Sequence, residues 1–225
     1  MLHSGRHITS TQDVGTDDLP RQWDGEHRPL VAFDFDGTLT ARDSFQAFLA
    51  WRSNPIQLAS AAFHLSPSGL SYLQNQNRVA LKAAMIRHFL KGISRAQLWT
   101  ETRQFAAERS RSLLRPDAVA CWKRWQARGA RLIIVTASPE PLVAPFAHGL
   151  GAERVIGTRL DFDDQDCVTG ALVGANCRGP EKVARLKAIY GQDMVLEAAY
   201  GDSQGDREML QMASEQGMRV FTSKP

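Results

Sequence analysis

Residues 31–40 read VAFDFDGTLT, an apolar run that leads directly into two acids and a glycine. A continuous apolar run is typical of a buried strand, and Gly37 supplies the turn that ends it. Because side chains alternate along extended backbone, we expect Asp34 and Asp36 on one side and Phe35 on the other. Two carboxylates this close indicate either ligands of a divalent metal ion or a nucleophile beside a general acid/base.

The size and composition are those of an ordinary globular protein. The chain has 225 residues, 43% hydrophobic and 23% charged, enough for one domain or one domain with a large insertion. Residues 1–28 are polar and lack the apolar segment of a signal peptide, so we expect a flexible cytoplasmic tail. No apolar run approaches the length of a membrane span. The three cysteines have unrelated spacings, which favours a reducing compartment over a disulfide framework or a zinc site.

The basic charge is concentrated in one segment. Residues 42–118 contain eleven Lys/Arg and four Asp/Glu, whereas the rest of the chain has 16 basic and 20 acidic residues. The overall net charge of +3 is too small to indicate nucleic acid. A basic segment is most often a solvated helical surface, but as a whole it also favours an anionic ligand or surface.

The pattern changes to helical spacing after Thr40. We expect helices over 42–53, 77–91 and 95–113, with Gly92 ending the second helix and Ser94 capping the third. The predicted organisation is therefore a tail over 1–28, an α/β core over 29–41 and 116–225, and an inserted helical cap over 42–115.

Strands and helices alternate in the remainder of the chain. The expected helices cover 116–127, 140–149, 180–190 and 205–216; the expected strands cover 132–135, 155–158, 194–200 and 218–221, with a hairpin over 160–172. This alternation predicts a doubly wound, Rossmann-like parallel sheet. Ligands of such sheets bind beyond the carboxyl ends of the strands.

Polar residues stand at the carboxyl end of each expected inner strand. They are Asp34 and Asp36, then Thr136 and Ser138, then Asp202 and Asp206, with Lys182 opening the helix between the last two strands. Singly, Thr136 is most simply a helix cap, Lys182 a solvated residue and Asp206 a loop acid. Their meeting at one edge of one sheet indicates a functional site.

These motifs resemble those of the haloacid dehalogenase (HAD) superfamily. Residues 34–38 (DFDGT) resemble its first motif, Thr136 its second, Lys182 its third, and residues 201–206 (GDSQGD) its fourth. The resemblance covers residues 30–222, and a helical insertion after the first motif is similar to the cap of phosphoserine phosphatases. Residues 136–140 and 176–183 most resemble subgroup IB, which includes phosphatidylglycerophosphatase C and CicA-like proteins.

The resemblance implies a phosphomonoesterase that works through an aspartyl-phosphate. Asp34 would be the nucleophile, and Asp36 would protonate the leaving oxygen and then deprotonate water. Thr136 would donate to a phosphate oxygen, Lys182 would balance charge, and the backbone N–H groups near Gly37 and Ala137 would help hold the phosphate.

The resemblance also implies a Mg²⁺ site. The metal ion would join Asp34, the backbone carbonyl of Asp36 and Asp202, a hard oxygen ligand set that suits Mg²⁺. Asp206 would either touch the metal ion through water or brace Lys182, and the sequence leaves both open.

The substrate depends on the inserted segment, where fewer residues match. Asp43 lies where phosphoserine phosphatases carry a cap acid, but their cap arginine has no clear equivalent, since Lys82 and Arg87 are both nearby. Arg178 could meet a second anionic group of the substrate, or could be a surface residue.

A lipid phosphate is the other substrate that the resemblance implies. The apolar residues 55–65, beside basic helices, could contact an anionic membrane peripherally, or could pack the cap's own small core. The sequence thus leaves open a soluble phosphomonoester such as phosphoserine and a phosphatidylglycerophosphate-type lipid.

Three other classes of protein fit this sequence less well. A signalling receiver domain has no inserted cap, and its phosphorylated acid ends a later strand than its metal-binding acids. A catalytically silent binding protein with this fold would be free to lose the acids, Thr136 and Lys182. A nucleic-acid module would carry motifs that are absent from this sequence.

Overall fold

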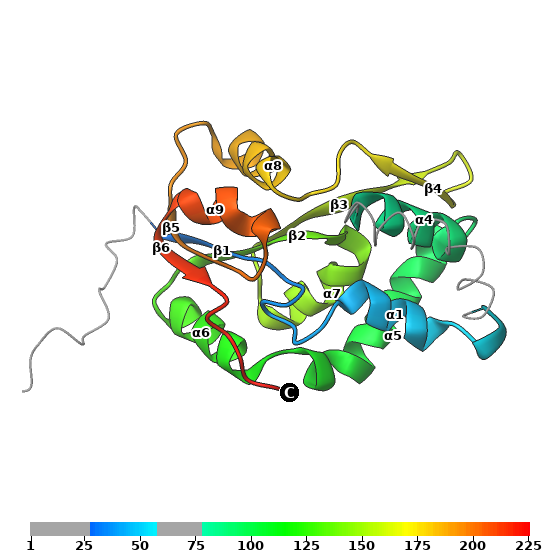
Figure 1. The fold of residues 1–225 in the computed structure, drawn as a ribbon, viewed down its shortest axis with the longest axis horizontal. Coiled ribbons are helices and arrows are strands. Elements are labelled where there is room, and N and C mark those ends of the chain that lie inside the picture. The colour runs from blue at the N-terminus through cyan, green and yellow to red at the C-terminus, as the bar shows by residue number, and fades with distance from the viewer. Residues whose placement is uncertain (1–27, 58–77) are drawn as a thin grey trace, which may run out of the picture.

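The computed structural model describes residues 28–57 and 78–225. Its centre is a six-stranded sheet with the strand order β4-β3-β2-β1-β5-β6, parallel except for β4 (Figure 1). The strands are β1 (Leu30–Phe33), β2 (Arg131–Pro139), β3 (Arg154–Phe162), β4 (Val168–Val173), β5 (Leu196–Gly201) and β6 (Ala213–Met218). The expected doubly wound parallel sheet is confirmed.

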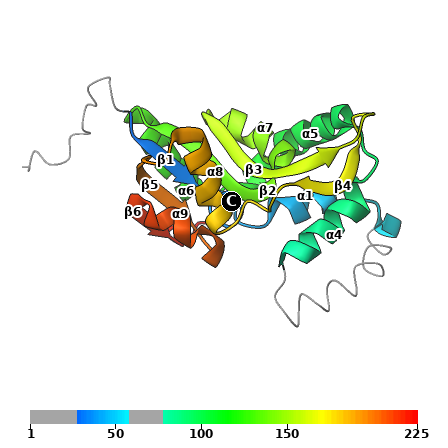
Figure 2. The same ribbon diagram turned by 90° about the horizontal axis from the view of Figure 1, so that it is seen from above.

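Helices cover both faces of this sheet. They are α1 (Ser44–Arg52), α4 (Arg78–Leu90), α5 (Arg95–Leu113), α6 (Pro116–Ala127), α7 (Glu140–Leu150), α8 (Pro180–Tyr190) and α9 (Arg207–Gln211), with a 3₁₀ turn over Gln204–Asp206. One face carries α8 and α9, and the other carries α6 and α7 (Figure 1). Figure 2 shows α4 beside β4, at the end of the sheet remote from β6.

Alternation along the strands builds two apolar cores. Val31 and Phe33 of β1 face the core shared with α5, α6 and α7, whereas Leu30 and Ala32 face the core beneath α8 and α9. Each of these four residues is at most 7% exposed. Burial on both faces explains why β1 reads as a continuous apolar run.

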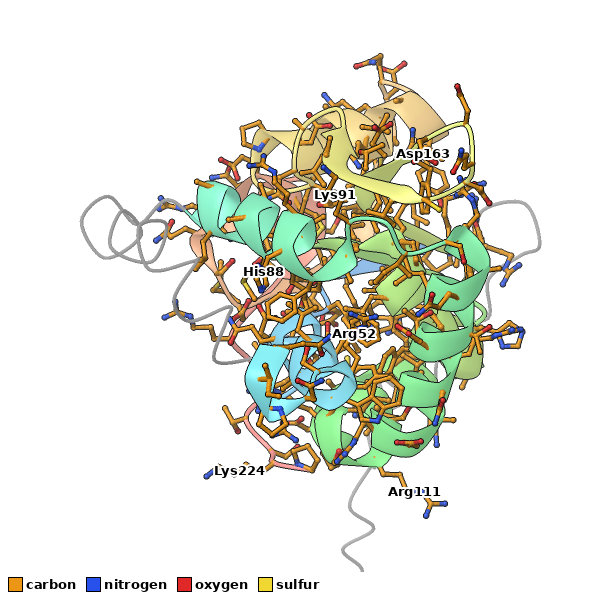
Figure 3. The ribbon with its side chains drawn as sticks, turned by 90° about the vertical axis from the view of Figure 1, so that its right-hand side faces the viewer. Arg52, His88, Lys91, Arg111, Asp163 and Lys224 are labelled. Carbon is orange, nitrogen blue, oxygen red and sulfur yellow. The ribbon has the colours of Figure 1, made fainter. Side chains whose placement is uncertain are left out.

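The inserted helices share the larger core with the sheet layer. Phe105 of α5 packs edge-on against Phe146 of α7, with ring centroids 5.9 Å apart. Arg52 at the end of α1 donates to Glu101 of α5 at 2.9 Å and to the Phe89 carbonyl in the last turn of α4 at 2.9 Å. In Figure 3 Arg52 lies between these three helices, so one guanidinium ties the insertion together.

Backbone hydrogen bonds fix the insertion to the core at two places. Residues 39–41 pair with 113–115, through Ala41 N–H to the Leu113 carbonyl and Arg115 N–H to the Leu39 carbonyl, both at 2.8 Å. Residues 92–95 pair with the start of β4, with Val168 N–H donating to the Ile93 carbonyl at 2.9 Å. The segment after α4 therefore covers the outer edge of β4.

Three expectations about the core elements are wrong. The expected helix over 205–216 ends at Gln211, and the last strand is 213–218 rather than 218–221, because β6 pairs in parallel with β5. Ala, Glu, Gln and Met there favour a helix locally, but tertiary pairing outweighs that preference. The separate strand over 155–158 and the first hairpin strand are one continuous β3.

Other expectations fall outside the described part of the chain. The tail over residues 1–27 and residues 58–65 of the apolar stretch are not among the described residues. Within residues 28–57 and 78–225, no helix combines the length and the apolar character needed to cross a membrane.

Candidate active site

The carboxyl ends of β1, β2 and β5 meet at a cavity of about 390 Å³. Ten of the candidate residues taken from the sequence line it. They are Asp34, Asp36, Gly37, Asp43, Thr136, Ala137, Arg178, Lys182, Asp202 and Asp206. The order β2-β1-β5 places these strand ends side by side, although they are far apart along the chain.

A buried lysine joins two of the acids. Lys182 Nζ donates to Asp34 Oδ1 at 2.7 Å, to Asp206 Oδ1 at 2.6 Å and to the Val135 carbonyl at 2.6 Å. All three charged side chains are at most 8% exposed. Three acceptors match the three N–H bonds of an ammonium group, so every hydrogen-bond donor of the Lys182 side chain has a partner.

Burial governs the ionisation of this trio. Burial, opposed by Lys182 and assisted by Asp206 and Asp36, raises the pKa of Asp34 to about 7. Burial opposes the charged form of Lys182, but Asp34 and Asp206 prevail and raise the lysine pKa above its usual value. Burial likewise opposes ionisation of Asp206, but Lys182 and Ser203 lower the pKa of its carboxyl. Asp34 therefore needs further positive charge nearby to stay ionised over a wide pH range.

The carboxylate of Asp36 lies toward the insertion rather than toward α8. Its Oδ1 accepts from the backbone N–H of Ser44 at 2.7 Å, at the start of α1, and its Oδ2 accepts from the hydroxyl of Ser138. Phe35 between the two acids is fully buried in the larger core. The two acids thus face one cavity while being held by different elements.

An interruption of strand pairing shapes the second strand end. The β2–β3 register shifts between Val135 and Pro139, which takes residues 136–138 out of the regular ladder. Thr136 Oγ1 accepts from the Ser138 backbone N–H at 3.0 Å, which leaves the hydroxyl proton of Thr136 for a ligand. Thr136 is fully buried and lines the cavity.

The loop after β5 is held by Asp206. Its Oδ2 accepts from Ser203 N–H and Ser203 Oγ, each at 2.9 Å, while its Oδ1 accepts from Lys182. Since both oxygens have donors, the geometry favours Asp206 as a brace for Lys182 over a metal ligand.

Glycine is required where the first and last motifs touch. Gly37 has φ +84°, and a Cβ atom there would lie 2.3 Å from Asp202 Oδ2. The positive φ and the close approach both disfavour a side chain. The missing Cβ lets the Asp202 carboxylate reach the first motif.

The donor set suits a divalent cation. Carboxylate oxygens of Asp34, Asp202 and Asp206 lie within 4.8 Å of one another. Burial and the neighbouring Asp206 raise the pKa of Asp202 despite the opposing effect of Lys182 and Arg219, as expected where acids outnumber the cations near them. Hard carboxylate oxygens are the ligands that Mg²⁺ prefers.

Residues of the insertion also reach the cavity. Lys82 of α4 lines it and donates to the Ala137 carbonyl at 3.0 Å, whereas Arg87 does not line it. Asp43 caps α1 by accepting from Gln46 N–H, and burial together with Asp36 raises the pKa of its carboxyl. The insertion therefore contributes one acid, Asp43, and one cation, Lys82, to the described lining of the cavity.

Sequence reasoning gave no role to Ser44, Ser138, Asn176 or Ser203. Ser138 and Ser44 hold Asp36, Ser203 holds Asp206, and Asn176 lines the cavity. The polar residue Ser138 two positions after Thr136 was a usable signal, but its partner lies 102 residues away.

Fold and site together define a doubly wound α/β protein with an acidic, lysine-bridged cavity at the carboxyl edge of its sheet. The chain belongs to the haloacid dehalogenase-like hydrolase family, whose model matches residues 31–211.

Comparisons with known proteins agree with this assignment. Protein CicA of Caulobacter vibrioides is 54% identical over 200 residues, which cover 88% of this chain and 90% of that protein. A solved structure of a protein of unknown function from Bordetella pertussis Tohama I has 25% identity and a TM-score of 0.72, covering 84% of this chain and 88% of the other. A phospho-aspartyl intermediate analogue of phosphoserine phosphatase shares the fold, with a TM-score of 0.56 and 19% identity over 84% of this chain and 85% of that chain.

The buried lysine gives a stability prediction. Lys182→Met leaves the carboxylates of Asp34 and Asp206 buried without their counter-ion, so we expect the free energy of unfolding to fall by about 3–5 kcal/mol. Urea denaturation in metal-free buffer measures this loss. The matched control is Lys187→Met on the same helix, where the side chain is less buried and a change within about 0.5 kcal/mol is expected. Equal stabilities of the two variants would contradict the central role of Lys182.

Proposed function

We propose that this protein hydrolyses phosphomonoesters through an aspartyl-phosphate on Asp34. The observation that carries the proposal is the buried Asp34 carboxylate, which is fixed by Lys182 and lines the same cavity as Asp36. Membership of a hydrolase family supports the reaction class. A buried acid at a cavity, ordered by a lysine and next to a second acid, is suited to nucleophilic catalysis.

In the first step Asp34 attacks phosphorus in line. A bond forms between a carboxylate oxygen and phosphorus as the bond to the leaving oxygen breaks. Lys182 and the Thr38 hydroxyl, which donates to Asp34 Oδ2 at 3.2 Å, hold the carboxylate in position. Asp36, in its protonated form, gives a proton to the leaving oxygen.

In the second step Asp36 takes a proton from the water that attacks the acyl phosphate. The phosphorus–oxygen bond to Asp34 breaks, and inorganic phosphate leaves. The Thr136 hydroxyl, with the backbone N–H groups near Gly37 and Ala137, is proposed to hold the phosphate oxygens. Ser44 N–H and Ser138 keep the Asp36 carboxylate over the cavity in both steps.

Mg²⁺ is the proposed cofactor. Asp34, Asp202 and the Asp36 carbonyl would hold it, and it would neutralise charge on the phosphoryl group. Five acids and three basic residues line the cavity, which supports a need for added positive charge.

The substrate class remains a small phosphomonoester or a lipid phosphate. Asp43 and Lys82 together would suit a zwitterionic group such as that of phosphoserine. A lipid phosphate is favoured by Ile56, the described apolar residue of stretch 55–65, whose side chain is 80% exposed. A peripheral contact with an anionic membrane belongs to this second candidate. The free thiols support the proposed cytoplasmic setting.

The test of the reaction is the hydrolysis of p-nitrophenyl phosphate by variants of the two acids. Asp34→Asn is expected to abolish turnover, because an amide is not a competent nucleophile. Asp36→Asn is expected to slow it strongly and to allow phosphorylated protein to accumulate, detectable by mass spectrometry under acid quench. Retained activity in Asp34→Asn would refute the mechanism. A wild type inactive on every phosphomonoester would instead favour a silent binding protein.

Metal dependence has a separate test. EDTA is expected to inactivate the enzyme and Mg²⁺ to restore it, while Mg²⁺ raises the thermal midpoint of the wild type through binding to the folded state. Asp202→Asn should weaken this thermal shift, whereas Asp193→Asn, at an exposed position before β5, should leave it as in the wild type. Full activity in EDTA would contradict the metal assignment.

The two substrate candidates differ in physical state, since a lipid phosphate lies in a membrane or micelle, whereas phosphoserine is dissolved in water. A lipid phosphatase is expected to give a higher kcat/KM with a phosphatidylglycerophosphate analogue in mixed micelles than with phosphoserine or other soluble esters. Ile56→Ser should reduce that preference but leave turnover of soluble esters unchanged, because Ile56 is exposed and outside the cavity. Equal or better turnover of phosphoserine would assign the enzyme to soluble substrates.

A further inference from the structure

A second cavity adjoins the proposed active site, and none of the described residues of the insertion lines it. It has a volume of about 680 Å³ and lies between the end of β4 and the start of α8. Asn176, Arg178 and Gly205 line both cavities. The two spaces are therefore neighbours, and Arg178 is the cation at their junction.

Among the basic residues of the described cavity wall, Arg178 has the largest number of unused donors. A guanidinium has five N–H donors, and that of Arg178 makes a single hydrogen bond with the residues that the structure describes, from Nη1 to Ser203 Oγ at 3.5 Å. No carboxylate of the described residues forms an ion pair with it. Lys182, in contrast, is fully used by its three acceptors, and Lys82 is bound to the Ala137 carbonyl.

The backbone around Arg178 is shaped to hold its side chain at the junction. A Cβ atom on Gly205 would lie 2.6 Å from Arg178 Nη1 and 2.7 Å from its Cζ, so only glycine lets the guanidinium lie against this loop. Gly179, with φ +59°, donates from its backbone N–H to the Gly205 carbonyl at 2.8 Å. The loop before α8 and the loop after β5 are thus clamped together around Arg178.

The neighbouring wall is also fixed. Thr158 Oγ1 donates a hydrogen bond to Asn176 Oδ1 at 2.7 Å. The same oxygen accepts a hydrogen bond from the backbone N–H of Cys177 at 3.1 Å. This contact orients Asn176 beside Arg178 in both cavities. A preorganised cation with unused donors between two connected cavities is the arrangement of a binding subsite.

We propose that Arg178 binds a second oxyanion, a carboxylate or a further phosphate, carried by the leaving group of the substrate. The preferred substrates are then phosphomonoesters with two anionic groups. The second anionic group binds to Arg178 of the core rather than to a residue of the inserted helices. Arginine suits both oxyanions because its planar fork can donate two parallel hydrogen bonds. The assignment rests on the proposed function for the identity of the first group.

Ligands that cannot be hydrolysed test the subsite without turnover. The series is methylphosphonate, phosphonoacetate, 3-phosphonopropionate and 4-phosphonobutyrate, with bisphosphonates of matched length, titrated calorimetrically into the full-length protein with Mg²⁺. At least one chain length is expected to bind about tenfold or more tightly than methylphosphonate, as one charge-assisted contact provides. The carboxylate and bisphosphonate arms decide which second oxyanion is preferred.

Two variants connect that preference to Arg178. Arg178→Ala is expected to remove it, whereas Arg178→Lys keeps part of it. Gly205→Ala leaves the charge in place but displaces the guanidinium, so it should lower the preference too. The control Arg207→Ala removes the same charge from an exposed position that lines neither cavity, and should keep the preference of the wild type.

The outcomes separate this inference from the proposed function. Absence of any preference for two anionic groups, or its persistence in Arg178→Ala, overturns the subsite. An equal loss for methylphosphonate and the longer ligands also overturns it, since Arg178 would then bind the first phosphoryl group. Tight, Arg178-dependent binding by a protein that hydrolyses no phosphomonoester would retain the subsite and refute the proposed function.

Discussion

The buried ammonium of Lys182 is the interaction on which the site depends. It joins Asp34 after β1, the Val135 carbonyl of β2 and Asp206 after β5, and it stands on α8. An isolated charge in this interior would cost several kcal/mol, so each group is tolerable only while the others are present. The contact therefore locks four segments together and fixes the orientation of the proposed nucleophile in the same step.

The sheet order makes that contact geometrically available. With β1 central and flanked by β2 and β5, three carboxyl ends lie at one edge, and the helix after the β3–β4 hairpin crosses above them. The interrupted ladder in β2 then turns residues 136–138 toward the cavity instead of along the strand. The chemistry of the site is thus a consequence of topology together with one local irregularity.

Several helices and strands could be predicted from the sequence because the residues that determine them are close together along the chain. The first residues of α5, α6 and α8 could be predicted because Ser94, Pro116 and Pro180 are residues that favour a helix start. Strands β1, β2 and β5 could be predicted because each is an apolar run that ends in polar residues. The C-terminal strand was predicted at 218–221 instead of 213–218 because ASEQGM has helix-forming residues, and its pairing with β5 is not a local property. The Ser138–Asp36 contact was out of reach for the same reason, and the choice between the two roles left open for Asp206 also depends on which loops meet in space.

The two acids of the first motif are divided between the two halves of the molecule. Asp34 is held by the core through Lys182, whereas Asp36 is held partly by Ser44, the first residue of α1 in the insertion. Any displacement of α1 therefore moves the proposed acid/base relative to the proposed nucleophile. Lys82 of α4 also donates to the carbonyl of Ala137, so the insertion contacts the residue that precedes Ser138, the second support of Asp36. In this arrangement the inserted helices position the proposed proton-transfer group, whereas the proposed oxyanion subsite at Arg178 belongs to the core.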